Sequence, residues 1–516
     1  MIEHLRHLGR GFLSFGKYGG VLPLATRLEI AGLYTVLSIV FAAWVYDAAR
    51  TPTMTDNQHY FYVAERAASG VSPHISSFDP KHHASSLITA GAIRIGRVFG
   101  VSDPYSARAV SLAAMGLTIG ALWLLAVGLT RNPMAGHMAV AAMLSFSVYL
   151  WHSVMGAQPK IFLLLFMSLA MLATHARRPF WIGVTGITAY LCWQPGLIVW
   201  GVAIPVLLVQ SDRWKNLGWL MLGSLATILI YESYFLYHGS LAEQWFQAMV
   251  FPAEYMSHQK GGFPGLRPAW DALWQRWTKA YRWSNPVAAV AVAFIASCWI
   301  VMLARPKRAT RYLTKHPDWI ALGLGAHGTF LFTYYDSQGP PDFFFILPYL
   351  ALAFGMACGV LFRLLDRKYV RVLGHAAAVA VFAWSLHVSH ANRRAFHYKF
   401  TLDDQYALAE VVKQWQEEGR AVFVVRCTHL LALEHMDNFL NYGFIFPGLQ
   451  AYLTERGMKD FDPARGGRWP DLIVVSRLNN DSHFGKWLHI NYRLRRAREF
   501  ERQWIGVFQK RRSAPR

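Results

Sequence analysis

Long apolar runs recur along the whole chain, and they constrain its fold more than any other feature. Each run is about 18–22 residues long, the length that an α-helix needs to cross the hydrocarbon core of a bilayer. The sequence has 516 residues, of which 54% are hydrophobic, and it contains many such runs. One or two runs would fit a signal peptide or an anchor, whereas a series predicts a polytopic α-helical membrane protein.

We expect eleven membrane-spanning helices. Their predicted ranges are 29–47, 109–129, 137–155, 158–174, 180–194, 196–209, 217–237, 286–304, 319–335, 343–363 and 372–389. The connections alternate in charge: one set is rich in Arg and Lys, while the opposite short set, "GAQPK", "WQPG" and "DSQGPPD", holds one Lys. We therefore expect a multi-pass protein of the cell (inner) membrane. The positive-inside rule places its N-terminus in the cytoplasm and its C-terminus on the extracytoplasmic side.

The predicted spans divide the chain into three parts. A basic N-terminal segment, 1–28, precedes the membrane domain, 29–389, whose long outer loops are 48–108 and 238–285. We interpret the first span as an uncleaved anchor, with a transit peptide as the alternative. The formal net charge is +21. In a membrane protein the position of the basic residues relative to the spans indicates the topology. We therefore do not interpret the charge as a nucleic-acid-binding surface, and we expect no nucleic-acid partner.

The last part of the chain, 390–516, loses the span pattern. Thr401 and Asp404 have the spacing of a capping box, which predicts a helix through Glu417. "AVFVV" at 421–425 and "DLIVV" at 471–475 are typical of short buried strands. No glycine-rich phosphate loop, zinc spacing or nucleophile elbow is visible in its sequence. We therefore predict a small extracytoplasmic α/β domain that serves as an acceptor or partner module.

The first outer loop opens with "TDNQHYFYVAERAASGVSP", which is punctuated as a helix. Thr55 and Gln58 fit a capping box, which makes Asp56 the first helical residue, and Gly70 and Pro73 end the helix. A carboxylate there lies at the positive end of the helix dipole and stays ionised. The pattern is compatible with a catalytic acid and also with an acid that only stabilises the helix.

Two further residues lie where a lipid headgroup would meet the protein. Lys81, in "FDPKHH", precedes a second predicted helix at His83–Val98, and it fits either a contact with a lipid phosphate or a snorkelling side chain. Glu232, in "IYESYF", lies about one turn from the outer end of its span. An acid at that depth indicates a function unless it reaches the interface.

An aromatic stripe marks the second long outer loop. Trp270, Leu273, Trp274, Trp277 and Tyr281 share one helical face, and the cations Arg267, Arg276, Lys279 and Arg282 fall largely elsewhere. This arrangement predicts a helix in the headgroup plane. The pattern leaves open whether the helix only anchors the loop or also attracts an anionic lipid.

These features together resemble the GT-C glycosyltransferases, which transfer a sugar from a polyprenyl-phosphate donor on the outer side of a membrane. The similarity is greatest to the aminoarabinose-transferase, lipopolysaccharide-core-transferase and protein-mannosyltransferase kinds. It rests on "TDNQHYFYVAERAASG", "SFDPK", "GVSDPYSARAVSL", "QPG" at 194–196 and "DSQGPPDFFFILPYLAL". It implies a catalytic role for Asp56 and donor-phosphate binding by Lys81, with Arg108 matching the Arg that starts the second span.

The sequence also departs from the family pattern. Asn57 stands where relatives carry a second acid, "KHHAS" replaces Lys-Pro-Pro-Leu, and "GAQPK" lacks an acid that many relatives carry. A degenerate site therefore remains an alternative, in the form of a non-catalytic scaffold for envelope-glycan assembly. The other alternative is a lipid-linked-sugar transporter, although we find no internal repeat of the kind typical of transporters.

The resemblance implies a single inverting displacement, with Asp56 as the base. Phosphate-side cations would offset the charge that grows on the leaving group. The expected substrate-binding residues are His59, Tyr60, Lys81, Arg108, Glu232, Arg267 and Arg276. The expected acceptor is a glycan, a lipid or a protein. We expect no cofactor, and nothing in the sequence indicates a divalent metal.

Overall fold

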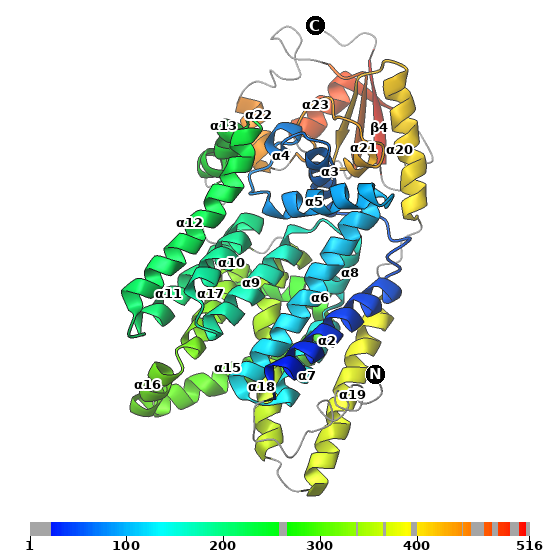
Figure 1. The fold of residues 1–516 in the computed structure, drawn as a ribbon. Helices are drawn as coiled ribbons and strands as arrows, with labels where there is room; N and C mark the ends of the chain where they lie inside the picture. Colours follow the sequence, from blue (N-terminus) through cyan, green and yellow to red (C-terminus); the bar gives the residue numbers. More distant parts are fainter. Residues whose placement is uncertain are drawn as a thin grey trace.

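A computed structural model describes residues 22–256, 266–336, 339–364, 368–393, 400–445, 447–455, 469–476, 483–495 and 505–511. It shows a long bundle of apolar helices with an α/β unit at one end and a thin layer of short helices between them (Figure 1). The N-terminal segment 1–21 lies outside the described residues.

The bundle is built from consecutive apolar helices. Within the described chain these are α2 (Leu24–Val45), α6 (Asp103–Thr130), α7 (Pro133–Ser145), α8 (Ser147–Met155), α9 (Pro159–His175), α10 (Pro179–Cys192), α11 (Leu197–Leu208), α12 (Arg213–Tyr237), α15 (Asn285–Ala304), α17 (Asp318–Asp336), α18 (Leu347–Leu364) and α19 (Lys368–Asn392). The helices α6, α7 and α9 are buried along most of their length, whereas α12 and α15 are widely exposed. A membrane protein shows this pattern because its peripheral helices face lipid rather than other helices.

Five stretches of the described chain are long and apolar enough to cross a membrane, and a bent pair makes a sixth. The bent pair is α7 and α8, which we expected to form one straight span at 137–155; instead they meet at 68°. Phe146 breaks the helix there, with a ψ of 76°. The helices α9, α10 and α11 are apolar but shorter. The eleven-span topology and its orientation stay predictions.

The thin layer consists mainly of the first outer loop. It contains α3 (Asn57–Ala68), α4 (Pro73–Ser76) and α5 (Ala84–Val98), which lie across the end of the bundle (Figure 1). The second predicted helix, His83–Val98, is therefore confirmed to within one residue. The expected capping box at Thr55 and Gln58 is wrong: α3 begins at Asn57, with Asp56 as its N-cap residue. Thr55 and Gln58 instead donate their side-chain hydrogen bonds to the carbonyls of Met54 and Thr53.

The second outer loop adds α13 (Leu241–Trp245), two π-helical turns, η2 (Phe246–Val250) and η3 (Pro252–Met256), and α14 (Leu266–Tyr281). The expected aromatic stripe on α14 divides in two. Leu273, Trp277 and Tyr281 pack against the bundle, whereas Trp270 and Trp274 are exposed and stack with ring centroids 6.4 Å apart. The positions 270 and 274 lie at the edge of the apolar face, so the bundle covers only the 273–277–281 row.

The described C-terminal residues combine helices with a four-stranded sheet. This C-terminal unit contains α20 (Leu402–Glu417), α21 (His429–Leu433), α22 (Pro447–Glu455), α23 (His483–Asn491) and the strands β1 (Val422–Val425), β2 (Leu472–Ser476), β3 (Tyr492–Arg495) and β4 (Ile505–Lys510). The sheet order is β1-β2-β4-β3, with β1 and β2 parallel and the other pairs antiparallel. The capping box of Thr401 and Asp404 is confirmed.

The C-terminal unit packs directly on α3. The Thr428 hydroxyl donates to the Gln58 carbonyl at 3.4 Å, and the Asn438 amide donates to the Tyr62 hydroxyl at 3.0 Å. Arg66 forms an ion pair with Asp437. The helix that carries Asp56 at its start is thus held between the bundle and the C-terminal unit.

Candidate active site

The Asp56 carboxylate lies at the start of α3, at the junction of the bundle and the outer layer. Its side chain is partly exposed and accepts no hydrogen bond from the residues that the structure describes. The preceding Thr55 has a φ of 56°, a left-handed conformation that costs a non-glycine residue about 1–2 kcal/mol. Strain of this kind is typical of functional sites. The carboxylate is therefore available to a ligand.

The neighbouring Asn57 has the opposite environment, because its amide is completely buried. Its Nδ2 donates to the carbonyls of Gly156 and His152, and its Oδ1 accepts from His152 Nδ1 and Gln158 Nε2, each at 3.1 Å. These bonds join the start of α3 to the connection between α8 and α9. The residue that replaces the family's second acid is thus a structural amide.

We expect Asn57→Asp to damage the protein rather than to restore an acid pair. A carboxylate there cannot donate to the two carbonyls, and each buried polar group left without a partner costs about 1–3 kcal/mol. The thermal midpoint of the purified variant should fall by several degrees, with Asn57→Ala as the comparison. If Asn57→Asp were as stable as the wild type or more stable, the amide donors of Asn57 would contribute nothing to stability.

Lys81 lies beside the first turn of α3. Its ammonium donates to the Tyr60 hydroxyl at 2.7 Å. Burial acts to lower the pKa of Lys81, yet the hydrogen bond to Tyr60 and the carboxylates of Asp79 and Asp56 raise it overall, so the ammonium stays charged. Burial also raises the pKa of the Tyr60 phenol, which therefore stays neutral and accepts this hydrogen bond. Tyr60 and Lys81 are thus in contact, and Asp56 lies close enough to influence the pKa of both.

Asp79 completes this group, and the sequence analysis did not single it out. Its buried carboxylate accepts a hydrogen bond from His59 Nε2 at 3.1 Å. Burial acts to raise the pKa of Asp79, but the His59 hydrogen bond and the charge of Lys81 lower it overall. Asp79 is therefore ionised and helps to keep Lys81 charged. The sequence signal that could have identified Asp79 is its position two residues before Lys81.

The segment that carries Lys81 is fixed from several sides. Gln194 Nε2, in the short helix η1 (Gln194–Gly196), donates to the Pro80 carbonyl at 3.1 Å. The His83 amide donates to the Tyr231 hydroxyl at 2.9 Å. The "QPG" stretch therefore contributes by holding the Lys81 segment against α10 and α12.

Arg108 lies apart from the Asp56 and Lys81 group. Its buried guanidinium donates to the carbonyls of Ala48 and Thr51. These bonds tie the start of α6 to the chain that follows α2. Arg108 thus positions the segment that leads to Asp56.

The remaining predicted residues lie on α12 and α14. Glu232, on α12, is half-buried and accepts a long hydrogen bond of 3.5 Å from Gln244. Arg267 and Arg276 are exposed on α14. No contact between these three residues and Asp56 or Lys81 is seen in the described structure.

A buried ion pair near the site also escaped the sequence analysis. Lys160, the single lysine of the short outer connections, pairs with Asp342 in the 3-10 helix η5 (Pro340–Ile346). Its ammonium also lies 4.4 Å from the ring centroid of Trp193. Asp342 further accepts from the Gly339 amide at 2.7 Å. The pair joins the start of α9 to the turn before α18.

One group of metal-ligating residue types occurs in the described chain, formed by Glu65, Asp103 and His435. Arg97 Nη2 already lies 2.9 Å from Glu65, 2.6 Å from Asp103 and 3.3 Å from His435 Nδ1. An internal cation therefore occupies the centre of this group. We interpret it as a link between α5, α6 and the C-terminal unit.

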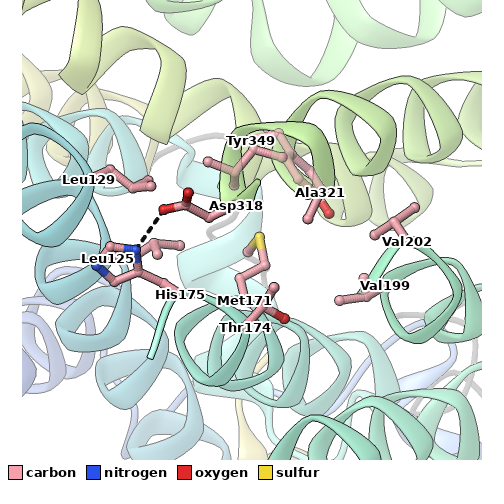
Figure 2. Close-up of a pocket in the computed structure, with 11 residues that line it drawn as sticks. Leu125, Leu129, Met171, Thr174, His175, Val199, Val202, Asp318, Ala321 and Tyr349 are labelled. Atoms are coloured by element: carbon pink, nitrogen blue, oxygen red, sulfur yellow. Dashed lines mark hydrogen bonds and ion pairs between the residues drawn. The ribbon is translucent and has the colours of Figure 1, made fainter. Parts of the chain in front are cut away.

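A small cavity inside the bundle is distinct from the Asp56 group (Figure 2). Its walls include the ion pair between His175 and Asp318, whose atoms are 2.8 Å apart, together with Met171 and Tyr349. Its volume of about 10 Å³ is that of a single water molecule. His175 ends α9, about 25 Å from the Gln158 end at 1.5 Å per residue. The cavity is too small and too distant to bind a sugar donor.

The buried histidines of the first outer loop give a testable pH dependence. Burial lowers the pKa of both His74 and His82 to about 4, from about 6.5. The unfolded chain therefore binds more protons between these values, so stability falls as the pH drops from about 6.5 toward 4. Each shift corresponds to about 3 kcal/mol. The thermal midpoint should drop over this range, and the drop should shrink in His74→Asn; a flat profile would contradict the neutral-histidine assignment.

The fold is similar to that of two GT-C glycosyltransferases of known structure. The chain is similar to the aminoarabinose transferase ArnT of Cupriavidus metallidurans bound to undecaprenyl phosphate, with a TM-score of 0.58 and 13% identity over 94% of this chain and 99% of that one. It is also similar to the oligosaccharyltransferase of Archaeoglobus fulgidus in the apo form, with a TM-score of 0.56 and 13% identity over 86% of this chain and 69% of that one.

A third similar structure is the Archaeoglobus fulgidus oligosaccharyltransferase AglB in complex with an inhibitory peptide and a dolichol-phosphate. Its TM-score is 0.51, with 12% identity over 93% of this chain and 74% of that one. No protein-family model and no curated protein matches the sequence. The similarity therefore lies in the fold and extends over nearly the whole chain.

Proposed function

We propose that this protein is a membrane glycosyltransferase that moves a sugar from a polyprenyl-phosphate donor to an acceptor hydroxyl on the outer face of the membrane. The observation that carries the proposal is that Asp56, a carboxylate without an internal hydrogen-bond partner in the described structure, lies close enough to the charged Lys81 to influence its pKa. The GT-C fold supports it, as do the undecaprenyl phosphate and dolichol-phosphate bound by two of the similar proteins.

In the proposed reaction the acceptor oxygen attacks the anomeric carbon as the bond from that carbon to the phosphate oxygen breaks. The Asp56 carboxylate takes the hydroxyl proton, and the leaving polyprenyl phosphate keeps the bonding electrons. Lys81 offsets the negative charge that grows on this phosphate. Because attack and departure occur on opposite sides, the anomeric configuration inverts.

We further propose that this chemistry needs no divalent metal. Lys81 supplies the positive charge that a metal would otherwise give to the phosphate. The Asn57 amide, next to Asp56, has each of its polar atoms bonded internally. Arg267 and Arg276, exposed on α14, are proposed to meet the donor phosphate or neighbouring lipid headgroups from the interface.

The two alternatives predict other features. A non-catalytic scaffold needs neither an available carboxylate in a strained turn nor a half-buried charged lysine near it. A transporter needs a central path through the bundle, whereas Asp56 and Lys81 lie in the thin layer of short helices at the end of the bundle. The observations therefore favour the enzyme.

The test is donor consumption by purified protein in detergent or nanodiscs. A panel of polyprenyl-phosphate sugars is supplied with candidate acceptors, with and without a chelator. We expect consumption of one donor, and we expect it to persist in the chelator. Failure of every donor and acceptor would favour the scaffold, and loss in the chelator alone would overturn only the metal-independent mechanism.

A further inference from the structure

Several buried polar atoms without a hydrogen-bond partner gather around the start of α5, which follows Lys81 in the chain. In the described chain they are Glu232 Oε2, Gln244 Oε1, His74 Nε2, His82 Nδ1 and His83 Nε2. Gln244 and His83 are each 1% exposed, and His74 is completely buried. A native protein leaves few such atoms unpaired, and each costs about 1–3 kcal/mol. Five in one region therefore require an explanation.

Short contacts connect these side chains. The ring centroids of His74 and His83 are 4.7 Å apart, and those of His82 and Tyr231 are 5.9 Å apart. Gln244 donates to Glu232, the residue next to Tyr231 on α12. The group thus occupies the space where α4, the start of α5, α12 and α13 meet.

The same group contacts the Lys81 segment through Gln247 in η2. Gln247 Oε1 accepts both from the Asp79 amide at 3.0 Å and from His74 Nδ1 at 3.2 Å. Gln247 therefore joins the unpaired atoms to the segment 79–81 that carries Lys81.

Hydrogen-bond directions define what these atoms can bind. Gln247 Nε2 donates to the His74 carbonyl at 2.8 Å, which confirms that Gln247 Oε1 is the acceptor. His74 Nδ1 must then carry its proton. Because burial keeps this imidazole neutral, its Nε2 is an acceptor.

The other side of the group is also an acceptor surface. Gln244 directs its amide NH₂ to Glu232, which leaves Gln244 Oε1 and Glu232 Oε2 without donors. A second acid, Glu243, lies close enough to influence the His74 pKa. These acids oppose the binding of an anionic group. A suitable ligand must therefore supply several hydrogen-bond donors and carry no negative charge at this point.

We propose that this group binds the sugar of the lipid-linked donor through its hydroxyl groups, while Lys81 binds the phosphate. The substrate class is a hydroxyl-bearing sugar without a carboxylate or other anionic substituent. This inference rests on the proposed function, because it assigns the sugar subsite of the same reaction. His74 and Gln244 are its specificity-determining residues.

The test compares lipids that differ only in the sugar. Undecaprenyl phosphate, a panel of undecaprenyl phosphates carrying neutral hexoses or pentoses, and one carrying glucuronate are titrated into the wild-type protein in nanodiscs. We expect at least one neutral-sugar lipid to bind more tightly than undecaprenyl phosphate, and the glucuronate lipid to show no such gain. Equal affinity for all lipids, or tightest binding of the glucuronate lipid, would overturn the inference.

A matched pair of variants separates recognition from structure. His74→Asn keeps a donor near Nδ1 for Gln247 but removes the Nε2 acceptor, whereas His74→Gln does the reverse. We expect His74→Asn to weaken the neutral-sugar lipid about fivefold, the factor that corresponds to about 1 kcal/mol, and to leave the Kd for undecaprenyl phosphate unchanged. His74→Gln should remain closer to the wild type for the sugar.

Gln244→Met tests a second residue of the group. In this variant the neutral-sugar lipid should no longer bind more tightly than undecaprenyl phosphate. Equal losses for both lipids in these variants would show a structural role and sink the assignment. The proposed function fails in a different way. Selective binding of a neutral-sugar lipid without transfer under any condition would leave the subsite intact and contradict the enzyme.

Discussion

Asp56→Asn should abolish sugar transfer while the protein still inserts, folds and binds its donor. The asparagine keeps the size of the side chain and can still serve as an N-cap residue, so α3 should remain in place. It cannot take a proton from the acceptor hydroxyl. Loss of a general base typically costs 10²- to 10⁴-fold, and we expect at least a hundredfold loss in kcat.

The measurement is the rate of donor consumption at saturating donor, together with the Kd for the donor. The matched control is Asp212→Asn, an exposed acid at the N-cap of α12, at the other end of that helix from Glu232. The control should retain full activity. Transfer by Asp56→Asn at the wild-type rate would remove Asp56 from the mechanism, and a parallel loss of donor binding would make it a binding residue instead.

Breaking the ion pair between Lys160 and Asp342 from one side should destabilise the protein strongly. Both side chains are largely buried. Lys160→Met leaves a buried carboxylate without its cation, and breaking a buried pair from one side costs about 3–5 kcal/mol. Native proteins are stable by only about 5–15 kcal/mol, so the thermal midpoint should fall sharply.

The double variant Lys160→Met, Asp342→Asn should recover most of this loss. The amide oxygen can still accept from the Gly339 amide, and no unpaired charge remains. As a control, Glu418→Gln removes the exposed pair with Arg420, which is expected to change the midpoint little. A double variant as unstable as Lys160→Met would show that packing, rather than the unpaired charge, causes the loss.

Local sequence patterns determined the elements of this protein. Apolar run length predicts the helix bundle because a span must satisfy its own backbone hydrogen bonds within one segment. The capping box of Thr401 and Asp404, the two buried strands and the second helix of the first outer loop are likewise confirmed, because each depends on residues within a few positions. The capping box at Thr55 failed since the chain before Asp56 bonds to its own backbone instead.

The partners of the charged and polar residues were decided only by the tertiary structure. Asp342 is 182 residues from Lys160, and Gln158 is 101 residues from Asn57. Asp79 likewise accepts a hydrogen bond from His59, and Arg108 donates to a backbone carbonyl that is distant in the sequence. Hydrophobic periodicity records which face of a helix is buried but not which distant side chain lies opposite. The sequence alone therefore singled out Asp56 and Lys81 as candidates, while the packing of the helices determined which residues surround them.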